Sequence, residues 1–510
     1  MVENNIFQKN VQALADIFPK LVQQVADYLE QYDPESGNAY LDTSVNGEPI
    51  IAVKENERLW YLNSRYSAAD SSYRWAEQYR DKNRLAVFVL YGLSDGSHIR
   101  ELLKNTCETN FILIYEPYTD VFMKVLMNID ISDLIYSQRV VIAVNNINME
   151  AAYEFVTAAI DYSKIRLVEY GSLPNYNSIY PEGWAELIRL GKNAVEVLVL
   201  DRNTQISFSH EFILNMLSNF DDIPEQYVIN QLKEKFDTCD IADIPAIIVS
   251  AGPSLDKNIS ELKKAEGKAF IIAADTALKS VLNAGVTPDL VMTVDPHKPA
   301  YLFAHSKMIH LPMVVCPQSN KELWGIHYGK RFYFVDDKSY ISDLYMRYAG
   351  IEAAPLETGG SVSNNCFSLA QYCGFKTLIL IGQDLAFTNN KKHTVAAYDG
   401  ADFDKMKSDE KYVEVEDIYG GKVLTNKGME AYLKWFEKQI LRYPELKVID
   451  ATEGGAKIRG SEIITFNEAI ERECIKSLDI KEIIADIPPV FDDETRRAIY
   501  KEFAELSDDL

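Results

Sequence analysis

The chain has 510 residues, of which 47% are hydrophobic and 25% are charged, a composition typical of globular proteins. A chain of this length is too long for one ordinary domain and predicts two or three. The formal net charge of −24 at pH 7 disfavours nonspecific binding to nucleic acid or to acidic membranes.

The six cysteines form no Cys-x-x-Cys pair, which argues against a zinc knuckle and against a disulfide framework. We therefore expect no metal site of this kind. The sequence shows no cleavable signal and no long apolar run, so we expect a cytoplasmic protein that does not insert into a membrane.

Residues 1–175 are predicted to form a small α/β domain. Apolar residues at helical spacing predict a helical opening over residues 1–35, divided at Pro19 because proline interrupts a helix interior. Asn46-Gly47 is a hairpin turn dipeptide. The predicted strands are 39–43 and 49–53 in the hairpin, and 85–90, 111–115 and 140–144 after it.

The turn after residues 85–90 has the sequence Tyr-Gly-Leu-Ser-Asp-Gly, and Glu116 follows the next strand. Glycines after one strand and an acid after the next resemble part of a nucleotide-binding fingerprint, without its three-glycine spacing. We favour a Rossmann-like domain that binds no cofactor. The alternative is a dinucleotide or S-adenosylmethionine site that uses Gly92, Gly96 and Glu116.

Residues 176–240 are predicted to form a helical connector, because apolar residues recur at helical spacing over 184–199, 208–220 and 226–236. The acidic tail, residues 471–510, has the same spacing and is predicted to be a solvated helical cap. Docking of a partner is the alternative function for this tail.

Residues 241–470 are predicted to form the central α/β domain and to hold the active site. The β-branched run 247–249 suits a buried parallel strand, and Gly252-Pro253-Ser254-Leu255 then turns the chain into a helix that Ser254 is placed to cap. Such a turn aims backbone N–H groups and a helix dipole at one point, which suits a phosphate.

Further strands are predicted at 269–274, 290–294, 312–316, 331–335 and 377–381, with helices between them. Ligands of an open parallel sheet lie outside the carboxyl ends of its strands. The polar residues expected to converge there are Asp275, Thr276, Asp295, Thr358, Gly359, Gly360, Ser361, Gln383 and Asp384.

The polar stretch 388–421 is long for a plain connection, which favours a binding loop or lid. His393 lies near its start. A helix at 427–443 and a strand at 448–451 are predicted to complete the domain.

Several motifs carry a family resemblance. Their sequences are Leu-Asn-Ser-Arg-Tyr at 62–66, Ser-Ala-Gly-Pro-Ser-Leu at 250–255, Ala-Asp-Thr-Ala-Leu at 274–278, Glu-Thr-Gly-Gly-Ser-Val-Ser at 357–363, Ile-Gly-Gln-Asp-Leu-Ala-Phe at 381–387 and Glu-Gly-Gly-Ala at 453–456. Together they resemble the Maf proteins, bacterial motility-associated glycosyltransferases that attach nonulosonic acids to flagellin. More distantly, the central motifs resemble bacterial sialyltransferases and archaeal 6-hydroxymethylpterin pyrophosphokinases.

The Maf resemblance implies a sialyltransferase-like fold and an inverting, metal-independent transfer of a nonulosonic acid from a CMP donor to serine or threonine of flagellin. It implies no cofactor besides the CMP-sugar substrate. The turn 252–255 would then hold the phosphate and the start of the helix after Gly359-Gly360 a second anion. Hydroxyls and amines of the ribose and the base would form hydrogen bonds with Asp275, Asp295, Gln383 and Asp384.

The sialyltransferase resemblance makes His393 the preferred general base, with His297 as a second candidate, and we also assign Asp295 to the catalytic set. The sequence lacks the tyrosine that sialyltransferases place near 352–357; Tyr340, Tyr345 or Tyr348 could replace it. Two other functions stay open. One is diphosphate transfer from ATP to a hydroxymethylpterin, and the other is a non-catalytic module that binds flagellin.

Overall fold

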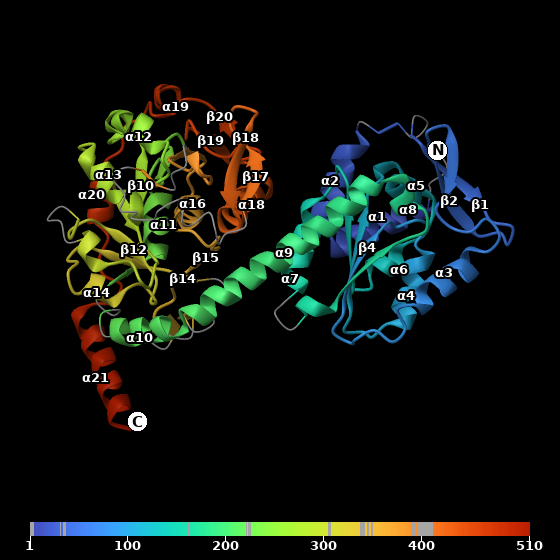
Figure 1. Ribbon diagram of the computed structural model, residues 1–510. Coiled ribbons are helices and arrows are strands. Elements are labelled where there is room, and N and C mark those ends of the chain that lie inside the picture. The colour runs from blue at the N-terminus through green and yellow to red at the C-terminus, as the bar shows by residue number, and fades with distance from the viewer. Residues whose placement is uncertain are drawn as a thin grey trace. The chain divides into compact units, whose positions relative to one another are not determined.

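The computed structural model describes residues 5–30, 32–33, 37–160, 164–220, 222, 226–303, 308–336, 342–343, 346–347, 350–388, 393–394 and 412–509. They form two compact units, Met1–Asn203 and Thr204–Leu510 (Figure 1). Each unit combines a parallel sheet with helices, which confirms the predicted α/β class. The division falls inside the stretch predicted as a helical connector.

The first unit opens with two helices, α1 (Asn5–Ile17) and α2 (Pro19–Leu29). Pro19 is the first residue of α2, so the division predicted at this proline is confirmed. The predicted hairpin is also present as β1 (Ala39–Thr43) and β2 (Pro49–Glu55), and β3 (Arg58–Tyr61) adds a third antiparallel strand.

A four-stranded parallel sheet with the order β6-β5-β4-β7 follows. The strand β4 is buried along its whole length, which matches its continuous apolar sequence. Because β5 and β6 lie on one side of β4 and β7 lies on the other, the chain reverses its direction of winding between β4 and β7. The strands are β4 (Val87–Tyr91), β5 (Phe111–Glu116), β6 (Val140–Val144) and β7 (Val168–Ser172).

Helices connect and cover these strands. They are α3 (Ala68–Glu77), α4 (Ser97–Asn105), α5 (Thr119–Asn128), α6 (Ser132–Ile135), α7 (Glu150–Ala159) and α8 (Tyr176–Ile179). The connector helices are α9 (Pro181–Ser207), α10 (Ser209–Asn219) and α11 (Ile229–Asp237).

The second unit is built on a nine-stranded parallel sheet with the order β20-β19-β16-β9-β10-β11-β12-β13-β8. From β9 the chain winds through β10 to β13 in one direction, and β16, β19 and β20 lie on the other side of β9. The strands are β8 (Tyr227–Val228), β9 (Ala246–Val249), β10 (Phe270–Ala274), β11 (Leu290–Met292), β12 (Met313–Val315), β13 (Arg331–Tyr333), β16 (Thr377–Ile381), β19 (Lys447–Asp450) and β20 (Glu462–Ile463).

Both faces of this sheet are covered, because alternate residues of each strand point to opposite sides. Ile248 belongs to the apolar cluster under α11, α16, α18 and α20, whereas Ile247 belongs to the cluster under α12, α13 and α19. These helices are α12 (Leu255–Asn258), α13 (Leu278–Asn283), α16 (Val362–Tyr372), α18 (Lys427–Arg442), α19 (Phe466–Glu473) and α20 (Ile480–Ala485).

Smaller elements complete the unit. The pair β14 (Val335–Asp336) and β15 (Pro355–Leu356) is parallel, and β17 (Tyr412–Glu416) and β18 (Lys422–Asn426) form an antiparallel hairpin. The end of the stretch predicted as a polar loop is therefore a strand. Two further helices of this unit are α14 (Lys321–Trp324) and α21 (Asp493–Asp509).

The beginning of the acidic tail packs against the second unit through one face of α20. Ile480, Ile484 and Ile487 are buried in the second unit, and the ammonium of Lys330 donates to the carbonyls of Ile484 and Ala485. Apolar burial and this lysine hold α20 against the sheet. None of the helices that the structure describes combines the length and the apolar character needed to cross a membrane.

Candidate functional site

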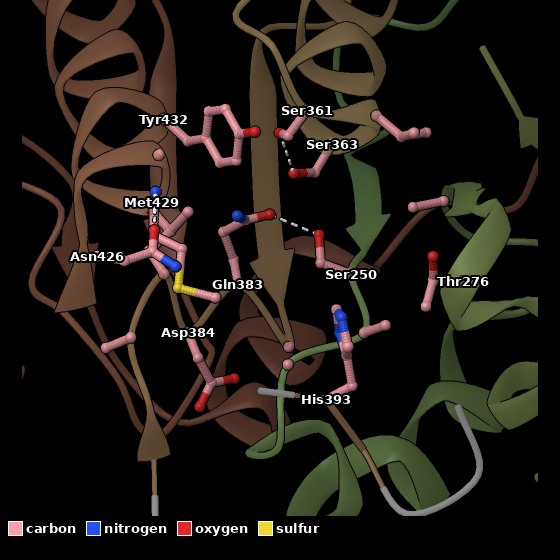
Figure 2. A pocket seen from close by; sticks show the side chains of 18 of the residues that line it. Ser250, Thr276, Ser361, Ser363, Gln383, Asp384, His393, Asn426, Met429 and Tyr432 are labelled. Carbon is pink, nitrogen blue, oxygen red and sulfur yellow. Dashed lines mark hydrogen bonds between the residues drawn. The ribbon is translucent and has the colours of Figure 1, made fainter. Parts of the chain in front are cut away.

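A cavity of about 500 Å³ lies at the carboxyl ends of β9, β10 and β16 (Figure 2). This is where the strand order of the nine-stranded sheet reverses, the position at which open α/β sheets bind ligands. Its lining includes Ser250, Ala251, Gly252, Ala274, Asp275, Thr276, Ser361, Val362, Ser363, Gly382, Gln383, Asp384, Leu385, Ala386, His393, Asn426, Lys427, Gly428, Met429 and Tyr432.

The exits of β9 and β16 are joined directly. Gly382 has φ +63°, and a Cβ there would lie 2.2 Å from the carbonyl oxygen of Ser250, so only glycine allows the two chains to approach this closely. The hydroxyl of Ser250 donates to Oε1 of Gln383 at 2.5 Å, as Figure 2 shows. These contacts place Gln383 on the cavity wall.

The Asp384 carboxylate lies against the Gly252-Pro253-Ser254 turn. It accepts the backbone N–H of Ser254 at 3.2 Å and the Ser254 hydroxyl at 2.5 Å. Burial raises the pKa of Asp384, while the hydrogen bonds from the Ser254 hydroxyl and N–H oppose this rise. A Cβ on Gly252 would lie 2.0 Å from Oδ1 of Asp384, so the glycine leaves room for the carboxylate.

Two predictions about this turn are therefore wrong. The Ser254 side chain does not cap the following helix, because its hydroxyl is bound to Asp384. The turn also does not present a free set of N–H donors to a phosphate, since Asp384 accepts the N–H of Ser254 and Gly382 accepts that of Gly252. Pro253, Ser254 and Leu255 are not among the residues that line the cavity.

The Glu-Gly-Gly-Ala motif at 453–456 contacts the same aspartate. The N–H of Ala456 donates to the carbonyl of Asp384 at 2.8 Å, and a Cβ on Gly455 would lie 2.2 Å from that oxygen. Two motifs that are far apart in the sequence thus meet behind the cavity.

The β10 side of the cavity carries Asp275 and Thr276. The Asp275 carboxylate accepts the backbone N–H of Thr276 at 2.6 Å and the Thr293 hydroxyl at 2.9 Å. The ammonium of Lys298 lies 3.0 Å from Asp275 and donates to the Thr276 hydroxyl at 2.6 Å. Sequence reasoning did not identify Lys298, because a single lysine after a strand has no distinctive pattern.

The opposite side is formed by the first turns of α16 and α18. Ser361 caps α16 by accepting the N–H of Asn364, and Asn426 caps α18 by accepting the N–H of Met429 at 2.8 Å. The first turns of both helices also carry N–H groups without intrahelical partners, which favours an anion. Thr358, Gly359 and Gly360 precede α16 but do not belong to the cavity lining.

Lys427 and Tyr432 of α18 also line the cavity, and neither was predicted. Lys427 lies 3.1 Å from Glu430 on the same helix. The predicted helix at 427–443 is present, but its contribution to the site depends on how α18 packs against α16 and the sheet.

His393 lines the cavity, as predicted from the position of its loop (Figure 2). The adjacent Thr394 is anchored by its N–H, which donates to the Ala251 carbonyl at 2.8 Å, and by a hydroxyl contact with Ser280 at 3.1 Å. The end of β9 therefore holds this histidine beside the site.

The other proposed catalytic residues lie elsewhere. Asp295 is not among the lining residues, and its carboxylate accepts the backbone N–H of His297. His297 lies 3.9 Å from Glu211 and packs against the ring of Phe208. Tyr340, Tyr345 and Tyr348 lie outside the described residues. Within the described ranges, no group of three or more His, Cys, Asp or Glu residues is arranged to hold a metal ion.

The corresponding turn of the first unit is filled by protein. A Cβ on Gly92 would lie 2.5 Å from the ring of Tyr176, which is fully buried. The Tyr176 hydroxyl donates to Glu116 at 2.7 Å and accepts the N–H of Ser94 at 2.8 Å. Burial raises the pKa of Glu116 to about 8, although Tyr176 and the backbone donate hydrogen bonds to it. The Tyr176 ring thus fills the space over Gly92, and its hydroxyl occupies the Glu116 carboxylate.

Comparison with known proteins adds a family match to this geometry. Residues 214–390 match the family described as MptE-like, 6-hydroxymethylpterin diphosphokinase MptE-like. The resemblance to the pterin kinases is confirmed over these residues. The match covers the connector's end and most of the sheet, including β9, β10 and β16.

Two individual proteins are also similar. An uncharacterized protein from Treponema pallidum (strain Nichols) is 27% identical over 133 residues, which are 25% of this chain and 58% of that protein. The chain thus spans less than two thirds of that relative. Among solved structures, a MAf glycosyltransferase from Magnetospirillum magneticum AMB-1 is similar with a TM-score of 0.48 and 15% identity, over 95% of this chain and 78% of that chain.

Proposed function

We propose that the protein is a glycosyltransferase that moves a nonulosonic acid from a CMP donor to serine or threonine hydroxyls of flagellin in the cytoplasm. The observation that carries this proposal is the convergence of four of the six family motifs, those at 250–255, 274–278, 357–363 and 381–387, on one cavity at the reversal of strand order. Ser361, the adjacent pair Gln383 and Asp384, and His393 come from three separate segments, and all line it. The substrates come from the motif resemblance.

The proposed reaction is a single displacement with inversion. The hydroxyl oxygen of the acceptor attacks the anomeric carbon of the donor sugar. The bond from that carbon to the phosphate oxygen breaks, and CMP leaves with the electron pair. The acceptor's proton passes to the imidazole of His393, which acts as general base at the cavity wall.

Charge on the departing phosphate would be met by the first turns of α16 and α18. In this proposal the N–H groups of these turns and the Lys427 ammonium would donate to the phosphate, since residues of both turns line the cavity. The turn at Gly252 does not hold the phosphate in this proposal, because the N–H of Ser254 in that turn already donates to the Asp384 carboxylate. Asp384 acts as a positioning residue that joins this turn to β16.

Diphosphate transfer from ATP to a hydroxymethylpterin is the second candidate, and the family match over residues 214–390 favours it. That chemistry normally uses magnesium held by clustered carboxylates. The sequence offers one acid at Asp295, and this residue does not line the cavity. We therefore rank the glycosyltransferase first.

The first experiment is a thermal-shift panel with CMP in EDTA and ATP with and without magnesium. A ligand that binds only the folded protein raises the melting temperature. We expect a shift with CMP that survives EDTA. A shift with magnesium-ATP alone would favour the kinase, and no shift with any nucleotide would favour a flagellin-binding module.

Transfer itself is tested with flagellin and a CMP-activated nonulosonic acid. His393→Ala should lose transfer about 100-fold or more while CMP binding is retained, since a general base contributes to the chemical step. His310→Ala is the matched control, because His310 is exposed and is not among the lining residues. Full transfer by His393→Ala would remove this residue from the mechanism.

A further inference from the structure

The hydrogen bonds around Thr276 fix the direction in which its hydroxyl can act. The Asp275 carboxylate only accepts, so the Thr276 hydroxyl donates its proton to Asp275, at 3.0 Å. The Lys298 ammonium only donates, so the same hydroxyl accepts from Lys298, at 2.6 Å. With its proton used, Thr276 can offer a ligand only its remaining lone pair.

The arrangement is rigid because its charges are buried together. The side chain of Asp275 is 1% exposed and that of Lys298 is 14% exposed, and their charged atoms are 3.0 Å apart. Thr293, itself buried, donates to the other oxygen of Asp275. A buried ion pair with these additional bonds holds both partners in one geometry.

The two sides of the cavity therefore differ in the hydrogen-bonding groups that they offer. The β10 side offers the remaining lone pair of the Thr276 hydroxyl as an acceptor, whereas the side formed by α16 and α18 carries the Lys427 ammonium as a donor, together with the hydroxyls of Ser361, Ser363 and Tyr432. An anionic group suits the donor side. A group that carries hydroxyl or amine protons suits the β10 side.

We propose that Thr276, held by Asp275 and Lys298, is a specificity-determining residue that accepts a hydrogen bond from a substrate hydroxyl. This inference rests on the proposed function, in which the cavity holds a CMP-sugar. The hydroxyl belongs either to the ribose or to the transferred sugar, since both carry such donors. Lys298 is a positioning residue, which acts by keeping the Thr276 proton on Asp275.

The test compares binding of CMP, 2′-deoxy-CMP, 3′-deoxy-CMP and the complete CMP-nonulosonic acid by calorimetry. If Thr276 reads the ribose, one deoxy analogue should bind wild-type protein about three- to tenfold more weakly, the value of one neutral hydrogen bond. Thr276→Val, which keeps the side-chain shape, should abolish that difference. Thr276→Ser should retain it.

The result differs if the hydroxyl that Thr276 accepts belongs to the transferred sugar. In that case Thr276→Val weakens the complete donor and leaves CMP and its deoxy analogues unchanged. Equal binding of every ligand by wild type and Thr276→Val overturns the inference and leaves the glycosyltransferase proposal standing. If cytidine nucleotides do not bind but ATP binds more tightly than 2′-deoxy-ATP or 3′-deoxy-ATP, the transferase fails and the role of Thr276 survives. Binding of no ligand in the panel overturns both.

Lys298→Met tests the positioning role. Without the ammonium, the Thr276 hydroxyl can turn and donate, so discrimination between the ribose forms should fall although Thr276 is present. Ser363→Ala, on the other side of the cavity, is the control and should affect ribo- and deoxynucleotides equally. Because Lys298→Met leaves Asp275 without its cation, Lys298→Met/Asp275→Asn provides a version without the unpaired charge. Unchanged discrimination in both variants would remove Lys298 from the proposal.

Discussion

The two α/β units of this protein each have a parallel sheet whose strand order reverses, and a glycine turn at the reversal. In the first unit, between β4 and β7, the ring of Tyr176 fills the space over Gly92. In the second, between β9 and β16, the space over Gly252 is taken by the Asp384 carboxylate, but a cavity of about 500 Å³ remains beside it. One crevice is closed and the other is open.

The comparison shows that a glycine after a strand indicates that another group packs closely against the backbone there. It does not indicate whether that group is a ligand or a protein side chain. At Gly92 the approaching group is an aromatic ring, and at Gly252 it is a carboxylate. A ligand site requires in addition that no side chain fills the crevice.

Opening the closed crevice should have the largest effect. Tyr176 is fully buried, so Tyr176→Ala should lower the free energy of unfolding of the first unit by about 3 to 5 kcal/mol. Tyr432, which is half-buried on the open cavity, is the counterpart, and Tyr432→Ala should cost less stability but weaken nucleotide binding. Hydrogen exchange of each unit in urea measures the two losses of stability. Similar losses of stability would contradict the distinction between closed and open crevices.

Filling the space over Gly252 should have the next largest effect. Gly252→Ala brings a carbon within 2.0 Å of Asp384 and 2.5 Å of the Gly382 carbonyl, so the turn and β16 must separate. We expect a loss of about 1 to 3 kcal/mol, the usual cost of overpacking, together with loss of nucleotide binding. Gly325→Ala is the control, since its added carbon would find its nearest neighbour at 3.8 Å. Equal stability of the two variants would contradict this account.

The closed crevice should also make stability depend on pH. Because burial raises the pKa of Glu116 to about 8, the folded state retains a proton that the unfolded state loses above its own pKa near 4.5. Stability of the first unit should therefore fall as pH rises from about 5 to 8, by at most about 1.4 kcal/mol per pH unit.

Glu116→Gln should flatten this slope, because glutamine does not titrate. Unfolding midpoints of wild type and variant at pH 5, 6, 7 and 8, followed through exchange of peptides from β4 and β5, provide the measurement. An identical slope in both proteins would show that Glu116 does not cause it.

The smallest effect is expected at the carboxylate of the open site. Ser254→Ala removes one hydrogen bond to Asp384 but leaves the backbone N–H of Ser254 in place. A loss of about 1 kcal/mol is expected from denaturant unfolding. Since a donor to the charged form is lost, the pKa of Asp384 should rise further, which carboxyl NMR titration can detect. An unchanged pKa would mean that the hydroxyl does not stabilise the carboxylate.

Much of the local structure was predictable from the sequence. The strands β6 (Val140–Val144) and β16 (Thr377–Ile381) have the predicted bounds, because both are short apolar runs between turn residues. Pro19 begins α2 because proline lacks the N–H that a helix interior requires. By contrast, β7 (Val168–Ser172) was missed, since its mixture of polar residues and Gly171 has no strand pattern; the glycine instead makes room for the Tyr79 hydroxyl.

The alternation of apolar runs and polar residues was enough to predict which polar segments end the strands, and several of these segments line one cavity. What each turn contacts depends instead on the folded arrangement of distant segments. Asp384 reaches Ser254 across 130 residues, and Tyr176 reaches Ser94 across 82. The roles of Lys298 and Lys427 likewise depend on neighbours from other segments. Backbone conformation follows from short-range sterics and hydrophobic period, whereas the occupant of a crevice is chosen by packing between distant segments, which no local pattern encodes.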